Sequence, residues 1–341
     1  MYHQLHRFAL LVLAILMMID AGGARAQSSQ NSRRIAIDGS STVFPISRAI
    51  AEDFQTTPEG SGVEMDVEFS GTSGGFRKFC AGETDINDAS RPISMSEIEA
   101  CRRSGIEFIE LPVAFDALTV VVNPQNDWAE ELSMSELRRI WTISASGDRI
   151  ENWQQIRPEW PELPLEIYGP GEDSGTYDYF VEAAIGDDSE IREDYITSED
   201  DSILVEFIRL NPNAIGYFGL AYFEANRSAL KAVAIDNGSG GVLPARETVE
   251  NGQYQPFSRP LFIYVNAEAA DAQPELKAFV SFYLENAAST AARVGYVPLP
   301  EAGYQVGITH FEALKVGSIF DEDSSTSISI EELIRRQEAL D

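Results

Sequence analysis

Three short loops rich in Gly, Ser and Thr constrain this chain most, because each stands where an apolar strand pattern gives way to a helical pattern. They occupy residues 39–42 (GSST), 71–75 (GTSGG) and 171–176 (GEDSGT). The first N–H groups of a helix have no partner within the helix, so a loop of small residues there attracts anions. Each loop alone is more often a helix cap, but three equivalent junctions predict one oxyanion held from several sides.

Strand and helix patterns alternate along the chain, which predicts an α/β fold with helices covering a sheet. Strands are expected over residues 34–38, 63–69, 106–111, 117–123, 165–168, 214–218, 233–235 and 261–265. Helices are expected over residues 45–57, 94–104, 133–141, 174–184, 202–210, 220–226 and 274–286, with another through Cys80. Two helices begin with a predicted capping box, formed by Ser94 with Glu97 and by Ser133 with Glu136.

The two most apolar strand patterns, ALTVVVN (117–123) and LFIYV (261–265), are the expected crossings between two lobes. This interpretation divides the chain into a first lobe of residues 34–117 and 266–312, a second lobe of residues 118–265, and an acidic, Ser-rich C-terminal tail of residues 313–341. The tail carries acidic and hydroxyl side chains at several positions of a calcium-binding loop. Because Thr326 stands where such a loop needs Gly, a linker before a short charged helix is preferred.

The first 26 residues have the pattern of a signal peptide: a basic start, an apolar run over residues 8–19, and the small-x-small sequence Ala24-Arg25-Ala26. The apolar run is too short to span a bilayer, which takes roughly 20 residues. The mature chain is therefore expected in the periplasm, after cleavage near Ala26.

Charge and cysteine content narrow the class of protein further. A formal net charge of −30 argues against nucleic-acid binding, which needs a basic surface. Two cysteines, Cys80 and Cys101, favour a disulfide in an exported protein, while two buried free thiols remain the alternative.

The residues give little support to the hypothesis that the protein is an enzyme. The sequence Gly71-Thr72-Ser73-Gly74-Gly75 matches the G-x-S-x-G nucleophile elbow of hydrolases, which needs a histidine base. His310 is the one histidine beyond the expected leader, so a secreted serine hydrolase is a distant alternative. No zinc ligand set and no dinucleotide fingerprint occur, so we expect no metal, no cofactor and no catalysis.

Four motifs in combination carry a resemblance to a known family: DGSSTVFPIS, SGTSGGFRKFCAGETDINDASRPIS, YGPGEDSGTYDYF and NAIGYFGLAYF. Between about residues 34 and 304 the chain resembles the phosphate-binding PstS proteins of ABC transporters. The resemblance implies a periplasmic solute-binding fold, with two α/β lobes closing over one dehydrated phosphate ion. It also implies a monomer whose partners are a membrane permease and its ATPase.

The matching motifs imply which residues bind the anion. They are Ser41, Thr42 and the N–H of Val43 in the first loop, Thr72 and Ser73 in the second, and Ser174, Gly175 and Thr176 in the third. Arg91 is the expected cation, because a guanidinium donates two parallel hydrogen bonds to a tetrahedral anion.

The chain departs from better-known relatives in its charged residues. Where those relatives have an arginine before the Ser-Gly-Thr loop, this chain has Pro170-Gly171, and where they have an aspartate it has Arg91. The group that accepts the proton of phosphate, and so rejects sulfate, must come from elsewhere. Asp173 is the main candidate, with Asp88 and Asp116 weaker. A receptor for sulfate, molybdate or another oxyanion therefore stays open, as does a surface phosphate scavenger acting outside transport.

Overall fold

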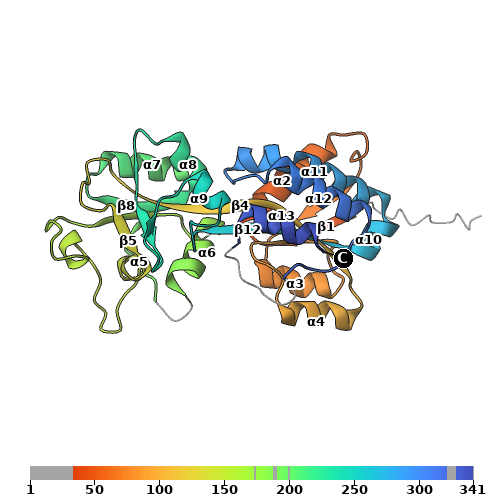
Figure 1. Cartoon of the computed structure of the whole chain (residues 1–341), viewed down its shortest axis with the longest axis horizontal. Coiled ribbons are helices and arrows are strands. Elements are labelled where there is room, and N and C mark those ends of the chain that lie inside the picture. The colour runs from red at the N-terminus through yellow and green to blue at the C-terminus, as the bar shows by residue number, and fades with distance from the viewer. Residues whose placement is uncertain (1–33, 173, 187–189, 199, 321–327, 341) are drawn as a thin grey trace, which may run out of the picture.

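The computed structural model describes residues 34–172, 174–186, 190–198, 200–320 and 328–340. Figure 1 shows two lobes side by side, with the strands β4 (Phe108–Val122) and β12 (Ser258–Asn266) at the waist between them. The expected two-lobed α/β architecture is confirmed. The expected signal peptide, residues 1–26, lies outside the described residues.

The first lobe is built on one end of a mixed sheet, in the order β2-β1-β3-β12-β4. β1 (Arg34–Gly39) pairs in parallel with β2 (Glu64–Val67) and β3 (Ile86–Ala89), whereas β12 runs antiparallel to β3 and β4. The helices of this lobe are α2 (Phe44–Gln55), α3 (Thr72–Cys80), α4 (Met95–Ser104), α10 (Ala267–Ala272), α11 (Pro274–Val294), α12 (Glu301–Glu312) and α13 (Ile330–Glu338). In Figure 1, α3 and α4 lie below this sheet and α2 and α11 above it.

The second lobe continues the same sheet beyond β4. The order there is β4-β8-β6-β7, formed by β8 (Ala214–Gly219), β6 (Glu166–Gly169) and β7 (Ile196–Thr197), while β9 (Lys231–Ala232) also pairs with β4. A smaller sheet joins β11 (Gly241–Val242), β10 (Ala234–Asp236) and β5 (Glu131–Ser133). The helices are α5 (Met134–Trp141), the 3₁₀ turn Trp153–Gln155, α6 (Gly175–Phe180), the π-helical turn η3 (Val181–Ile185), α7 (Asp201–Leu210), α8 (Leu220–Ala225) and α9 (Arg246–Glu250).

β4 differs from the expectation of two separate strands, since all of its 15 residues are buried and it runs unbroken through both lobes. The expected break contains Pro112, which cannot donate a hydrogen bond to a neighbouring strand. A bulge resolves this conflict: Phe262 pairs with Pro112 and Leu261 pairs with Ala114, so Val113 is the extra residue. Proline is tolerated in a sheet at such irregularities, which is why the strand continues.

The change from one lobe to the other falls within β4. Ala117 is its last residue paired with β12, and Leu118 is its first residue paired with β8. The expected second crossing, between residues 265 and 266, lies inside β12, which pairs with β3 and β4. Residues 258–265 therefore lie in the sheet of the first lobe. With residues 258–265 moved to the first lobe, we propose the same division of the chain into two lobes.

Each lobe has an aromatic centre that fixes its strands. In the first lobe, Phe76 of α3 packs edge-on against Tyr264 of β12, with ring centroids 4.9 Å apart. In the second lobe, Phe180 of α6 stacks on Tyr217 of β8 at 3.9 Å and meets Trp141 of α5. The two helices that follow the second and third Gly-Ser-Thr loops are thus anchored by buried rings on the strands.

The described part of the C-terminal tail packs against the first lobe. Ser318 Oγ, the Ile319 N–H and Gln337 Nε2 all donate hydrogen bonds to the buried carboxylate of Glu110 on β4. Burial raises the pKa of Glu110 to about 7. The calcium hypothesis concerned residues 321–332, of which residues 321–327 lie outside the described residues. Its last acid, Glu332, pairs with two arginines of α13.

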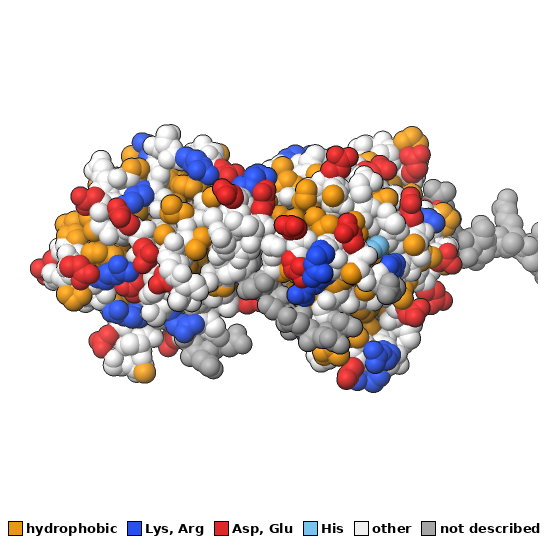
Figure 2. Space-filling model, in the orientation of Figure 1, with side chains coloured by type: hydrophobic (Ala, Val, Ile, Leu, Met, Phe, Trp, Pro, Cys, Tyr) orange, Lys and Arg blue, Asp and Glu red, His pale blue; other side chains and the backbone are white. Residues whose placement is uncertain are grey.

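No helix in the described ranges is long and apolar enough to cross a membrane. The surface carries charges of both signs. On the face shown in Figure 2, acidic and basic side chains are scattered over both lobes, with no patch of a single sign.

Candidate anion-binding site

A cavity of about 380 Å³ lies between the lobes, at the ends of the first two loops. Five predicted residues line it, namely Ser41, Thr42, Thr72, Ser73 and Arg91. The wall is completed by Ser40, Ser70, Gly71, Gly74, Arg77, Ser90, Asp178, Glu182 and Arg259. The cavity is therefore lined by small hydroxyl side chains, three guanidinium groups and two carboxylates.

The first loop closes on itself at the end of β1. The Thr42 N–H donates to Ser40 Oγ (3.2 Å) and the Val43 N–H donates to the Ser40 carbonyl (3.2 Å). Val43 is fully buried and does not line the cavity. Ser41 and Thr42 therefore line the cavity, whereas the predicted Val43 N–H is bonded within the loop.

The second loop is the first turn of α3, so Thr72 and Ser73 belong to the helix itself. The Gly75 N–H is bonded to the Gly71 carbonyl (2.8 Å), and Gly71 gives no side-chain cap. The N–H groups before Gly75 therefore stand at an uncapped helix start beside the cavity. A Cβ on Gly75 would lie 2.0 Å from Asn87 Oδ1, so only Gly lets this turn approach β3 so closely.

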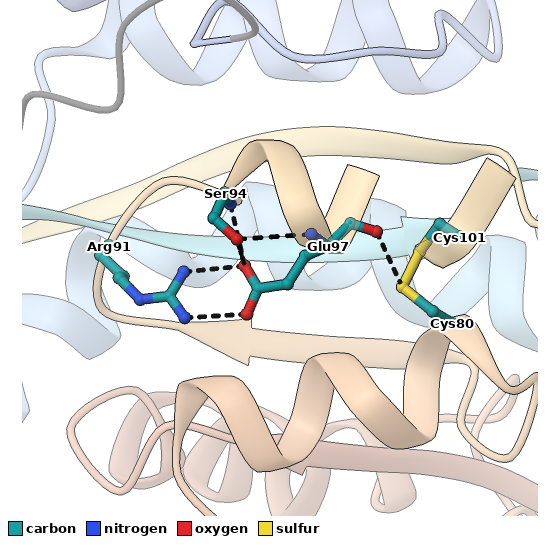
Figure 3. Close-up of a disulfide and its surroundings, with 5 residues drawn as sticks. All are labelled: Cys80, Arg91, Ser94, Glu97 and Cys101. Atoms are coloured by element: carbon teal, nitrogen blue, oxygen red, sulfur yellow. Dashed lines mark hydrogen bonds and ion pairs between the residues drawn. A yellow bond between two sulfur atoms is a disulfide. The ribbon is translucent and has the colours of Figure 1, made fainter. Parts of the chain in front are cut away.

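Arg91 follows β3 and is held by α4, as Figure 3 shows. Its Nη1 and Nη2 donate to the two carboxylate oxygens of Glu97 at 2.9 and 2.8 Å. Nη2 also donates to Ser73 Oγ at 2.8 Å. Burial alone would raise the pKa of Glu97, but the hydrogen bonds from Arg91 and Ser94 hold that pKa below its ordinary value.

The expected disulfide is formed between Cys80 and Cys101 and joins the end of α3 to α4. Both predicted capping boxes are also formed. In α4, the Glu97 carboxylate accepts from the Ser94 N–H (2.8 Å) as well as from Arg91. One carboxylate therefore caps the helix and orients Arg91, and the disulfide ties that helix to the helix of the second loop (Figure 3).

The third loop touches the first. Thr42 Oγ1 donates to the Gly175 carbonyl (3.3 Å), and a Cβ on Gly175 would lie 2.8 Å from the Thr42 N atom. Ser174 Oγ accepts from the Thr176 N–H, which caps α6. Ser174, Gly175 and Thr176 line an adjoining cavity of about 460 Å³, and Ser41 lines both cavities. Asp173, the predicted proton acceptor, lies outside the described residues.

Four charged residues of the cavity were not predicted, namely Arg77, Asp178, Glu182 and Arg259. Asp178 Oδ2 accepts from Ser41 Oγ at 2.9 Å, across the lobe boundary. Arg259 is only 4% exposed; it donates from Nη1 to Glu182 Oε2 (2.9 Å) and from Nη2 to Thr42 Oγ1 (3.0 Å). One signal for it was present in the sequence, because Ser258-Arg259-Pro260 repeats the tripeptide Ser90-Arg91-Pro92.

The two weaker acceptor candidates are buried and do not line the cavity. Asp88 lies behind the first loop, where Ser47 Oγ donates to its Oδ1 at 2.8 Å. Burial raises its pKa to about 8. Burial also raises the pKa of Asp116 to about 6, although Arg259, whose Nε lies 3.6 Å away, opposes that rise.

The residues needed for a serine hydrolase are not brought together. His310 is buried on α12, where burial lowers its pKa, and it does not line the cavity that contains Ser73. Ser73 Oγ accepts from Arg91 instead. Within the described ranges, no group of three or more His, Cys, Asp or Glu side chains is placed to hold a metal ion.

Comparisons with known proteins agree with this architecture. The family model of the PBP superfamily domain matches residues 24–287. Protein SphX of Synechocystis sp. is 50% identical over 95% of both chains. The phosphate-binding protein PstS of Staphylococcus saprophyticus is 34% identical over 85% of this chain and 88% of its own. The crystal structure of a possible phosphate binding protein from Planctomyces limnophilus shares 40% identity, with a TM-score of 0.78 over 83% of this chain and 99% of its own.

The raised pKa of Asp88 predicts a pH dependence of stability. A folded-state pKa of about 8, against an ordinary value of 3.8, means that the folded protein binds this proton more tightly than the unfolded chain. The unfolding free energy should therefore fall as pH rises from about 4 to 8. Asp88→Asn cannot ionise and keeps an oxygen for Ser47, so it should be more stable than the parent at pH 9 by about 1–3 kcal/mol. Urea unfolding of both proteins at pH 5, 7 and 9 measures this difference, and parallel pH curves would contradict it.

Proposed function

Because the chain belongs to the PBP superfamily, and within it to the family of PstS and SphX proteins, we propose that it binds inorganic phosphate between its lobes. In this proposal it delivers the ion to an ABC import permease and its ATPase, and performs no chemistry. The observation that supports this most is the composition of the interlobe cavity, where hydroxyls from two Gly-Ser-Thr loops meet the guanidinium of Arg91.

The cavity offers what a tetrahedral oxyanion needs. Hydroxyl groups rotate their hydrogens toward an acceptor, and the uncapped start of α3 adds backbone N–H groups and the positive end of a helix dipole. Arg91 supplies a charge-assisted donor, because its Nη2 bonds to Ser73 and thus lies at the cavity wall. The net charge of −30 opposes this binding little, since repulsion beyond about 10 Å is screened at 0.1 M salt.

The third loop completes the proposed site from the second lobe. Ser41 lines both cavities, and in this proposal the anion beside its hydroxyl also contacts Ser174, Gly175 and Thr176. Asp178, on the helix of that loop, is our candidate for the group that accepts the proton of phosphate. It is bonded to the Ser41 hydroxyl, and it takes part in no ion pair among the described residues.

The site of action follows from the same family membership. We infer that the protein is exported by its N-terminal segment, is cleaved near Ala26, and acts as a periplasmic monomer. The hydroxyl-lined cavity would capture phosphate there, and both lobes would present the closed form to the permease.

A titration tests the function directly. Calorimetry on purified protein, after removal of co-purified phosphate, should show one phosphate bound per chain with a Kd in the micromolar range or below, and no competition from equimolar sulfate. The hydroxyls and guanidinium groups of one cavity account for a single site. A flat phosphate titration would falsify the proposal, and stronger binding of sulfate or molybdate would identify another oxyanion receptor.

Arg91→Ala should weaken phosphate binding about 100-fold or more, since truncating one partner of a buried charge pair costs about 2–5 kcal/mol. Arg157→Ala is a matched control, because Arg157 makes the same forked pair, at 2.6 and 2.9 Å, with the capping-box residue Glu136 of α5. Arg157 does not line the cavity. Both variants should lose stability in thermal unfolding, but only Arg91→Ala should lose affinity. Equal affinities in the two variants would assign Arg91 a structural role.

Asp178→Asn should relax the rejection of sulfate, because sulfate has no proton to donate and a carboxylate in the site repels it. Competition titrations should show phosphate affinity reduced by about tenfold and sulfate binding increased. Asp148→Asn is the control: Asp148 makes a comparable bond to a serine hydroxyl, that of Ser146, away from the cavity. If sulfate still fails to compete in the Asp178 variant, the proton acceptor is another group.

A further inference from the structure

Arg259 stands out among the charged residues of the molecule, because a nearly buried guanidinium forms part of the cavity wall at the junction of the lobes. It projects from β12, the strand at the waist of the molecule in Figure 1. The comparisons name no role for it, and the sequence motifs did not identify it. Its surroundings indicate what it does.

Three of its contacts hold it from fixed elements. Its Nη2 donates to Thr42 Oγ1 (3.0 Å), its Nε lies 3.6 Å from Asp116 Oδ2, and its Cζ lies 3.6 Å from the centre of the Tyr179 ring. Asp116 and Tyr179 are both buried. The bond to Thr42 also matters for the site: Arg259 donates to the Thr42 oxygen, and the Thr42 hydroxyl donates in turn to the Gly175 carbonyl (3.3 Å), so Arg259 is linked to the first and third loops.

The fourth contact is different in kind. Nη1 of Arg259 donates to Glu182 Oε2 at 2.9 Å, and the Glu182 side chain is 60% exposed, whereas that of Arg259 is 4% exposed. A carboxylate with this exposure can move into water at little cost in solvation. The buried guanidinium cannot follow it: Asp116 stays near Nε, but Nη1 is left without the anion to which it donates.

We propose that Arg259 is a second guanidinium of the anion site, and that bound phosphate displaces Glu182 from it. Glu182 lines the same cavity, so an anion entering there would meet a like charge unless this side chain moves. Phosphate replaces the carboxylate as the partner of Nη1, while Nη2 keeps its bond to Thr42. One bound phosphate then lies against both the first loop and β12. This inference rests on the proposed phosphate function.

The consequence is that Glu182 is an internal competitor of the ligand. Its removal should make binding tighter, which is the opposite of what removal of a ligand-binding residue does. Glu182→Gln retains the size and a hydrogen-bond acceptor but not the charge. We expect it to lower the Kd for phosphate about three- to tenfold in calorimetry at pH 7.5 and low salt, with a smaller gain at 0.5 M NaCl.

Glu206→Gln is the control, because Glu206 is another exposed carboxylate of the same lobe that pairs with an arginine, Arg209, but does not line the cavity. Its Kd should remain within twofold of the parent. Arg259→Gln should weaken binding at least tenfold, and adding it to Glu182→Gln should remove the gain. Since Arg259 is buried, the folding of its variants has to be checked by circular dichroism. If they do not fold, the phosphate titration of Glu182→Gln alone tests the proposal.

An unchanged or weaker affinity of Glu182→Gln overturns the proposal, because Glu182 would then be a spectator or a direct acceptor of the phosphate proton. This failure is distinguishable from failure of the phosphate function. In the first case the parent protein binds phosphate and the variant gains nothing, whereas in the second the parent protein gives no phosphate signal at all.

Discussion

A guanidinium withdrawn from water must keep an anionic partner, and the arrangement of the cavity follows from that requirement. Arg91 satisfies it through Glu97 of α4, and Arg259 satisfies it through Asp116 and Glu182. The first pair lies within one lobe and is fixed by a helix cap and a disulfide, whereas the second reaches across the junction. One positive group is therefore positioned by local structure, and the other depends on how the lobes meet.

Local signals in the sequence predicted local structure well. The capping boxes of Ser94 and Ser133 formed because their partners stand three residues away. The disulfide was expected from the even cysteine count of an exported chain, and the hydroxyl loops were recognised from short patterns. Arg259 was not found, because its partners Thr42 and Glu182 lie 217 and 77 residues away in the chain. No periodicity reports a contact of that range, and the repeated Ser-Arg-Pro tripeptide marks Arg259 without its partners. Asp178 and Glu182 were missed for the same reason, although both lie within six residues of the end of the third loop.

The misjudged elements share a physical cause as well. β4 was expected to break near Pro112, but a bulge at Val113 removes the need for the missing hydrogen bond. The C-terminal tail was expected to contain a short charged helix, and α13 is that helix, but its attachment to the first lobe was not predicted. Donors from Ser318 and Gln337 join the Tyr264 hydroxyl at the buried carboxylate of Glu110. In both places a long-range partner decided the outcome over the local composition.

The attachment of α13 to the first lobe bears on the order in which the protein can be assembled. Residues 34–117 cannot complete their core alone, because their sheet needs β12 and their buried Glu110 needs Ser318 and Gln337 from the far end of the chain. The second lobe draws mainly on one continuous stretch. Because synthesis proceeds from the N-terminus, the first lobe begins to form first but is completed last. The apolar surface of its early segments stays unburied until β12 and α13 have been made.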